Sequence, residues 1–179
     1  MGFAHKILPQ YTYEDYLLWE GRWELIDGIP YAMAPMPVPE HQWIAGNLHA
    51  EFREALKRAD CKCKVYQPLD YKLSDDTIFN PDLLIVCQPI TKKYLDFAPS
   101  LVVEILSEST AMKDRHIKYP RYEAEGILYY LIVDAGIRAV EVYQLIDERY
   151  QRQPVSPGQP FPFQFDTCRF EVALDQIWE

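Results

Sequence analysis

Two short apolar runs, residues 83–86 and 101–106, are distinctive because an acid accompanies each of them. The first follows Asp82 directly, and the second encloses Glu104; the other residues of both runs are valine, isoleucine and leucine. Continuous runs of this kind are typical of strands covered on both faces of a sheet. An unpaired carboxylate there costs several kcal/mol, so the pattern predicts that a metal ion or a basic side chain accompanies these acids.

The rest of the pattern predicts helices and strands in alternation. Thr12 followed by acids is a typical helix start, and Asp27-Gly28 is a preferred two-residue hairpin turn. Pro120 lacks a donor N–H, so we expect it to kink or break the helix in which it lies. The expected elements are a helix at 12–19, a hairpin at 22–33, an extended proline-rich entry at 34–39, a helix at 40–58, strands at 63–67 and 71–73, a turn at 74–77, strands at 83–86 and 101–106, a helix capped within 107–110 and ending before Gly126, strands at 128–133, 139–145 and 149–153 (an edge strand), a loop at 154–167, a strand at 168–172 and a helical turn at 174–178.

Composition narrows the class of protein. A chain of 179 residues with 49% hydrophobic and 25% charged residues is expected to form one globular domain, 1–179. The net charge of −9 argues against broad electrostatic attraction to nucleic acid, so a polyanion would need a local basic patch or a bound metal. No apolar run is long enough to span a bilayer, and residues 1–6 lack the apolar core of a signal peptide. The four cysteines lack zinc-site spacing, so we expect reduced thiols in a cytoplasmic protein.

Asp82 and Glu104 are the strongest candidates for chemistry. If the two strands are neighbours, their carboxylates could converge and hold Mg²⁺, or Mn²⁺ as a substitute. Such an ion activates water and neutralises charge that develops on a phosphate. Lys118 is the candidate for a nearby ammonium, because Asp114, Lys118 and Tyr122 share one helix face at a spacing of four residues.

At this point the chain resembles a known family. The segments that carry the resemblance are Arg22 to Gly28, His41-Gln42, Pro81-Asp82, Leu101 to Ser107, Ser109-Thr110, and Asp114, Lys118, Tyr122 and Gly126. In this order they resemble the Uma family of restriction-endonuclease-like proteins, within the PD-(D/E)XK nuclease superfamily. The resemblance implies a restriction-endonuclease-like α/β (α+β) fold, in which helices flank a mixed central β-sheet, with an N-terminal hairpin and a long second helix.

The same resemblance implies an activity and its residues. It implies a Mg²⁺-dependent endonuclease that hydrolyses DNA, often as a homodimer. Asp82 and Glu104 match the metal-binding acids, and Glu24 matches an upstream acid of the site. Leu106 stands where the superfamily has lysine, and Lys118 matches the helix lysine that takes over this role in variant members. The implied catalytic residues are therefore Asp82, Glu104, Lys118 and Glu24.

Structural alternatives remain for each residue. Asp82 could cap a strand, Glu24 could pair with a lysine across a strand, and Lys118 could form a solvent-exposed helix ion pair with Asp114. Histidines on the helix at 40–58, His41 among them, are more often satisfied structural residues than catalysts. Two other functions stay open as well: a catalytically impaired, nuclease-like module that binds DNA or protein, and a metal-dependent hydrolase of a small phosphorylated molecule.

Overall fold

A six-stranded mixed sheet forms the centre of the computed structural model, which describes residues 8–33, 37–107 and 110–179. Its strand order is β10-β9-β8-β7-β6-β3; β7 and β8 run parallel, and the other neighbours are antiparallel. The strands are β3 Lys64–Tyr66, β6 Leu83–Val86, β7 Leu101–Ile105, β8 Tyr129–Asp134, β9 Ala139–Ile146 and β10 Arg149–Gln153. The structure therefore confirms the mixed α+β fold, and it confirms that β10 is an edge strand.

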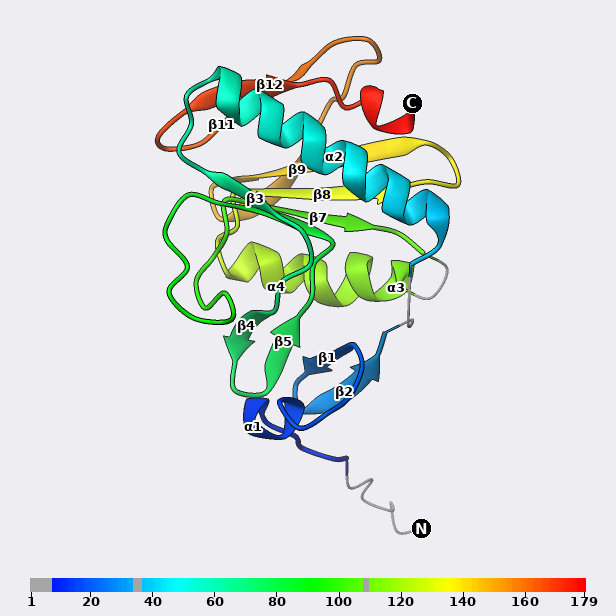
Figure 1. The fold of residues 1–179 in the computed structure, drawn as a ribbon, viewed down its shortest axis with the longest axis vertical. Helices are drawn as coiled ribbons and strands as arrows, with labels where there is room; N and C mark the ends of the chain where they lie inside the picture. The colour runs from blue at the N-terminus through cyan, green and yellow to red at the C-terminus, as the bar shows by residue number, and fades with distance from the viewer. Residues whose placement is uncertain (1–7, 34–36, 108–109) are drawn as a thin grey trace.

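Helices cover the two faces of this sheet (Figure 1). The long helix α2, Pro39–Arg58, buries Ile44, Leu48 and Phe52 against Leu101 and other residues on one face. The neighbouring residue Val102 points to the opposite face and packs in a second cluster that contains Tyr122. This alternation explains why the apolar run in β7 is continuous, because both of its faces are buried.

The helix over the second face is continuous but changes type along its length. It consists of α3, Ala111–Lys113, a π-helical turn at Asp114–Lys118 (η1), and α4, Tyr119–Ala124. The Tyr119 N–H donates to the carbonyl of Asp114, five residues back. Pro120 then lies in the first turn of α4, where a missing N–H costs little. Pro120 thus follows directly after a π turn, and the helix is not broken there. Residues 108 and 109 of the predicted N-cap lie outside the described residues.

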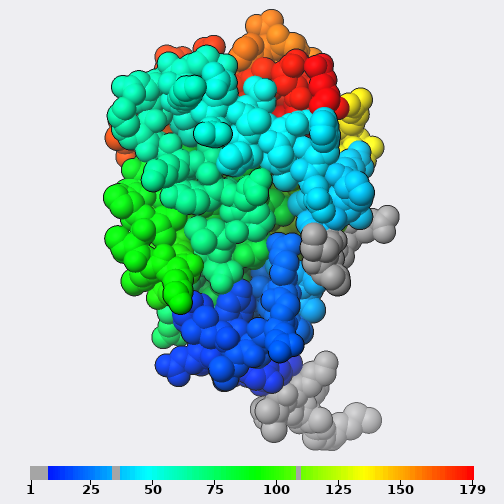
Figure 2. All heavy atoms as spheres, in the orientation of Figure 1, coloured from blue at the N-terminus to red at the C-terminus, as the bar shows by residue number. Residues whose placement is uncertain are grey.

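A second sheet of four strands packs beside the first. Its order is β2-β1-β5-β4, and its strands are β1 Trp23–Ile26, β2 Ile29–Ala32, β4 Tyr71–Ser74 and β5 Thr77–Phe79. Asp27 and Gly28 both have positive φ, 50° and 76°, as the predicted two-residue turn requires. The short helix α1, Tyr13–Tyr16, lies next to this sheet (Figure 1). In Figure 2, the segment that contains α1 and β1, in blue, lies at one end of the molecule, and the C-terminal segment, in red, lies toward the other end.

Two predictions about local structure were wrong. Strand β5 begins at Thr77, inside the expected turn at 74–77, and Ile78 and Phe79 are fully buried. Strand β11, Phe161–Gln164, lies within the expected loop and pairs with β12, Arg169–Val172. Strand β11 contains Pro162, which is tolerated because β11 has one neighbouring strand among the described residues and is thus an edge strand. The chain ends in a 3₁₀ turn, Gln176–Trp178. The proline-rich residues 34–36 lie outside the described residues.

The expectation of reduced thiols was also wrong. The structure pairs Cys61 with Cys168 and Cys63 with Cys87. The spacing Cys61-x-Cys63 therefore places two half-cystines that have different partners, and neither cysteine serves as a metal ligand. Within the described part of the chain, no helix is long and apolar enough to cross a membrane.

Candidate active site

Four elements bring the predicted residues together. Glu24 lies in β1, Asp82 directly precedes β6, Glu104 lies in β7, and Lys118 ends the π turn η1. In the antiparallel pair of β6 and β7, Leu83 stands opposite Val103. The same register, continued by one residue, places Asp82 opposite Glu104. The structure thus brings the two acids to the same end of adjacent strands, as their positions in the sequence suggested.

Lys118 is at the centre of a buried ion cluster. Its Nζ lies 2.8 Å from Glu24 Oε1, 2.8 Å from Glu104 Oε1 and 3.3 Å from Asp114 Oδ1. The side chain is only 2% exposed, so the alternative of a solvent-exposed helix ion pair is wrong. Burial acts to lower the Lys118 pKa, but the three carboxylates outweigh this effect and raise that pKa well above its usual range. Lys118 therefore stays an ammonium.

Glu24 is fully buried and contacts two lysines of the helix. Its Oε2 bonds to Lys113, its Oε1 contacts Lys118, and Oε1 also accepts the backbone N–H of Asn80 at 2.9 Å. Burial acts to raise the Glu24 pKa, but the two lysines lower it below its usual value. Both partners come from the helix over the sheet, so the alternative of a cross-strand lysine pair is wrong for Glu24.

The pKa of Glu104 is shifted in the opposite direction to that of Glu24. Its Oε1 accepts hydrogen bonds from Lys118 Nζ and from the hydroxyl of Tyr122, each at 2.8 Å. Burial nevertheless raises the Glu104 pKa well above its usual value, and the nearby charges of Asp114, Asp82 and Glu24 add to the rise. Lys118 opposes this shift without cancelling it. Burial is therefore the main reason for the raised pKa of Glu104, and the three neighbouring carboxylates add to it.

A histidine that sequence reasoning did not select lies beside Asp82. His41, in the first turns of α2, places Nε2 3.2 Å from Asp82 Oδ2, and the same oxygen accepts the N–H of Ile105 at 2.8 Å. Burial acts to lower the His41 pKa, but its hydrogen bond to Asp82 raises that pKa overall. Within residues 8–33, 37–107 and 110–179, Nδ1 of His41 is buried without a hydrogen-bond partner. Asp82 has a structural role as well, because it fixes the end of β7.

The oxygen atoms of the two acids suit a divalent cation. Among the described residues, protein hydrogen bonds reach Oδ2 of Asp82 and Oε1 of Glu104, and none reaches the other oxygen of either carboxylate. Mg²⁺ is typically bound by one or two carboxylates and retains several waters. The described side chains include no group of three or more His, Cys, Asp or Glu that could hold a metal, so an ion here would have at most two of these side chains as ligands.

Comparisons with known proteins identify a matching family and similar chains. Residues 13–173 match the family model Uma2, described as "Putative restriction endonuclease". The uncharacterized protein slr1290 of Synechocystis sp. is 31% identical over 147 residues, which cover 78% of this chain and 77% of that protein. The crystal structure of a putative nuclease belonging to DUF820, from Anabaena variabilis, superposes with a TM-score of 0.71 at 16% identity and covers 93% of this chain and 97% of that chain. At this identity the structural match shows the fold alone.

Proposed function

Because this chain belongs to the Uma2 family of putative restriction endonucleases, we propose that it is a metal-dependent endonuclease that hydrolyses phosphodiester bonds of DNA. The observation that carries the proposal is the opposed pair Asp82 and Glu104, each with one carboxylate oxygen free of protein hydrogen bonds among the described residues. Among the described residues, the buried acids Glu24, Glu104 and Asp114 outnumber the one buried lysine, Lys118, which favours a cation at the same place.

The ion bound there, Mg²⁺ or Mn²⁺, would activate a water and neutralise charge on the phosphate. Asp82 and Glu104 are its proposed ligands. The N–H of Ile105 and the imidazole of His41 hold one oxygen of Asp82, which directs the other oxygen away from these donors. Lys118 and Tyr122 do the same for Glu104. The chain's own groups thus orient both ligands before the ion or the DNA binds.

Lys118 and Glu24 have distinct proposed roles. The Lys118 ammonium is near the proposed ion but contacts three carboxylates, so it reaches a phosphate only if one of these ion pairs lengthens. We assign it to holding Glu104 in place and to offsetting negative charge near the scissile phosphate. Glu24 holds Lys118 and Lys113 from the opposite side. The homodimer implied by the family resemblance stays a prediction.

Incubation of supercoiled plasmid with Mg²⁺ or Mn²⁺ tests the proposal. We expect nicked or linear DNA from the wild-type protein and none in EDTA. Asp82→Asn and Glu104→Gln should each lower the rate on the order of 100-fold or more, as the loss of a preorganised charged group does in other enzymes. Asp60→Asn is the matched control, because Asp60 is 88% exposed and pairs only with Lys62 among the described residues.

Two results would distinguish the alternatives. Absence of nicking with either ion would refute the endonuclease proposal and leave a nuclease-like binding module. Turnover of a small phosphodiester such as bis(p-nitrophenyl) phosphate, without DNA cleavage, would instead indicate a small-molecule hydrolase. Melting curves followed by circular dichroism establish that each variant is folded at the assay temperature.

A further inference from the structure

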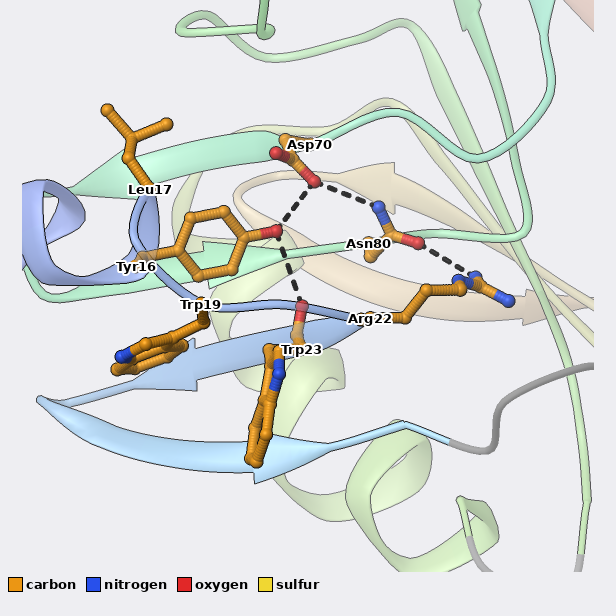
Figure 3. A pocket seen from close by; sticks show the side chains of 8 residues that line it. Tyr16, Leu17, Trp19, Arg22, Trp23, Asp70 and Asn80 are labelled. Carbon is orange, nitrogen blue, oxygen red and sulfur yellow. Dashed lines mark hydrogen bonds between the residues drawn. The ribbon is translucent and has the colours of Figure 1, made fainter.

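A pocket beside the candidate active site has walls unlike those of the core. Its volume is about 310 Å³, and it lies among α1, the start of β1 and the ends of β4 and β5. Its aromatic lining consists of Tyr16, Trp19 and Trp23, and its polar lining of Arg22, Asp70 and Asn80. Figure 3 shows the two indoles on one side of a row of polar groups that runs from Tyr16 through Asp70 and Asn80 to Arg22.

The sequence builds the aromatic wall locally. Gly21 adopts a φ of 88°, which strains any residue with a Cβ, and this turn leads the chain from α1 into β1. The turn brings the rings of Trp19 and Trp23 to 5.5 Å between centroids, and the ring of Tyr16 lies 5.7 Å from Trp19. The three side chains are only partly buried. They therefore present aromatic surface to the pocket as well as to one another.

Hydrogen bonds fix the polar wall. Tyr16 donates to Asp70 Oδ1 at 2.9 Å, and Asn80 Nδ2 donates to the same oxygen at 3.0 Å. Arg22 donates to Asn80 Oδ1 at 2.9 Å. The wall thus offers a carboxylate as acceptor at one end and a guanidinium as donor at the other. A carboxylate repels a phosphate but accepts hydrogen bonds from an amino group, so this wall suits the edge of a nucleobase.

The pocket is linked directly to the active site. The backbone N–H of Asn80 donates to Glu24, and Asn80 precedes Asp82 by two residues. Arg22 precedes Glu24 by two residues, and its guanidinium donates to the side chain of Asn80 at 2.9 Å. The residues that line the pocket therefore neighbour, in sequence and through hydrogen bonds, the residues of the candidate active site.

We propose that this pocket binds an unpaired nucleobase of the DNA substrate, next to the nucleotide whose phosphate is cleaved. The inference rests on the proposed nuclease function and adds the substrate class: single-stranded DNA, or duplex DNA with an unpaired base. Stacking on aromatic side chains tolerates any base, because every base has a π-face. It also provides affinity that does not depend on positive charge, which suits a chain with a net charge of −9.

Binding of labelled oligonucleotides in EDTA tests the inference without cleavage. By fluorescence anisotropy, we expect the wild-type protein to bind a single strand more tightly than the same sequence as a fully paired duplex. Trp19→Leu, which keeps apolar contacts but removes the π-face, should weaken single-strand binding by about 5- to 150-fold, the range for loss of one stacking contact. Trp19→Phe should retain most of the affinity. Trp43→Ala is the control, because Trp43 is 59% exposed and lies on α2, away from this pocket.

The results separate this inference from the nuclease proposal. Plasmid cleavage with equal affinity of wild-type and Trp19→Leu proteins for the single strand would overturn the nucleobase site and leave the nuclease. Tighter single-strand binding that depends on Trp19, without cleavage of either the plasmid or the single strand in Mg²⁺ or Mn²⁺, would support the nucleobase site and refute the nuclease. Equal losses in Trp19→Leu, Trp19→Phe and Trp43→Ala would overturn the inference, because stacking at position 19 could not explain them.

Discussion

Replacement of Lys118 by methionine tests whether the buried ion cluster stabilises the fold around the site. Methionine keeps an apolar stem but removes the ammonium that contacts Glu24 and Glu104 at 2.8 Å and Asp114 at 3.3 Å. Loss of one partner of a buried ion pair costs about 3–5 kcal/mol, because it leaves a buried charge unpaired. In a domain of this size, 1 kcal/mol shifts the melting temperature by about 2–4 °C. We therefore expect Lys118→Met to lower the Tm by roughly 6–20 °C at neutral pH.

The pH dependence of this loss gives a stricter test. Burial raises the Glu104 pKa and Lys118 opposes the rise, so the pKa should rise further in Lys118→Met. A carboxyl with a raised folded pKa takes up a proton on folding, and it costs stability as the pH rises from its unfolded pKa through its folded pKa. The Lys118 pKa lies well above its usual range, so Lys118 stays charged from pH 5 to 8 and adds no slope there. The Tm difference should consequently be larger at pH 8 than at pH 5.

Thermal unfolding at pH 5 and pH 8, followed by circular dichroism, measures both effects. Lys62→Met is the matched control, because Lys62 pairs with Asp60 at 2.6 Å but is 84% exposed. An exposed pair contributes about 1 kcal/mol or less. If Lys118→Met melted together with Lys62→Met at pH 8, the cluster would not stabilise the fold. If its loss were equal at the two pH values, lost packing and not unpaired charge would be the cause.

Other contacts of the site and the core give separate tests. Tyr122→Phe removes the 2.8 Å hydrogen bond to Glu104 and should lower the free energy of unfolding in urea by about 1.5–3 kcal/mol; an unchanged urea midpoint would contradict this role. Asp82 raises the His41 pKa, so the stability from this pair is fully present below the unfolded histidine pKa of about 6.5 and is lost as the pH rises through the folded pKa. His41→Gln should therefore differ more from wild type in urea at pH 6 than at pH 8, and a difference independent of pH would refute the pair. Cys61→Ser opens a loop of 107 residues and should cost about 4–5 kcal/mol of unfolding free energy. Peptide mapping without reductant should recover Cys61 linked to its partner, and free thiols in the purified protein would refute the bridge.

The core strands of the site could be predicted because their information is local. The apolar runs that carry Asp82 and Glu104 are strands with buried side chains, and the spacing of Asp114, Lys118 and Tyr122 correctly placed these residues on one face toward the sheet. The burial of the Asp114 and Lys118 side chains was not predictable, since a helix ion pair at a spacing of four residues has the same sequence whether it is exposed or buried. Burial depends on the sheet that the helix covers.

The features that the sequence did not predict depend on contacts between segments that are far apart in the chain. His41 meets Asp82 only because the first turn of α2 lies near the start of β6, and no spacing within α2 reveals this contact. The partners of Cys61 and Cys63 likewise lie far away in the sequence, Cys168 directly before β12 and Cys87 directly after β6, so the spacing of the pair could not indicate either bridge. Strand β5 was hidden by its short length, because Thr77–Phe79 is stabilised by pairing with β1 and β4 and not by local preference.

The position of the lysine follows from the geometry of the sheet. Residues 104 and 106 point to the same face of β7, so a lysine at position 106 would reach the site from the strand itself. Leu106 instead packs in the apolar cluster under the helix, together with Ile117 and Tyr119. Lys118 lies between these two helix residues in the sequence. Its ammonium therefore reaches Glu104 from the helix and not from β7 itself. The π turn widens the helix where Asp114 and Lys118 face the sheet, and it leaves Pro120 in the first turn of α4. The proline that had suggested a broken helix is therefore compatible with a buried lysine at the site.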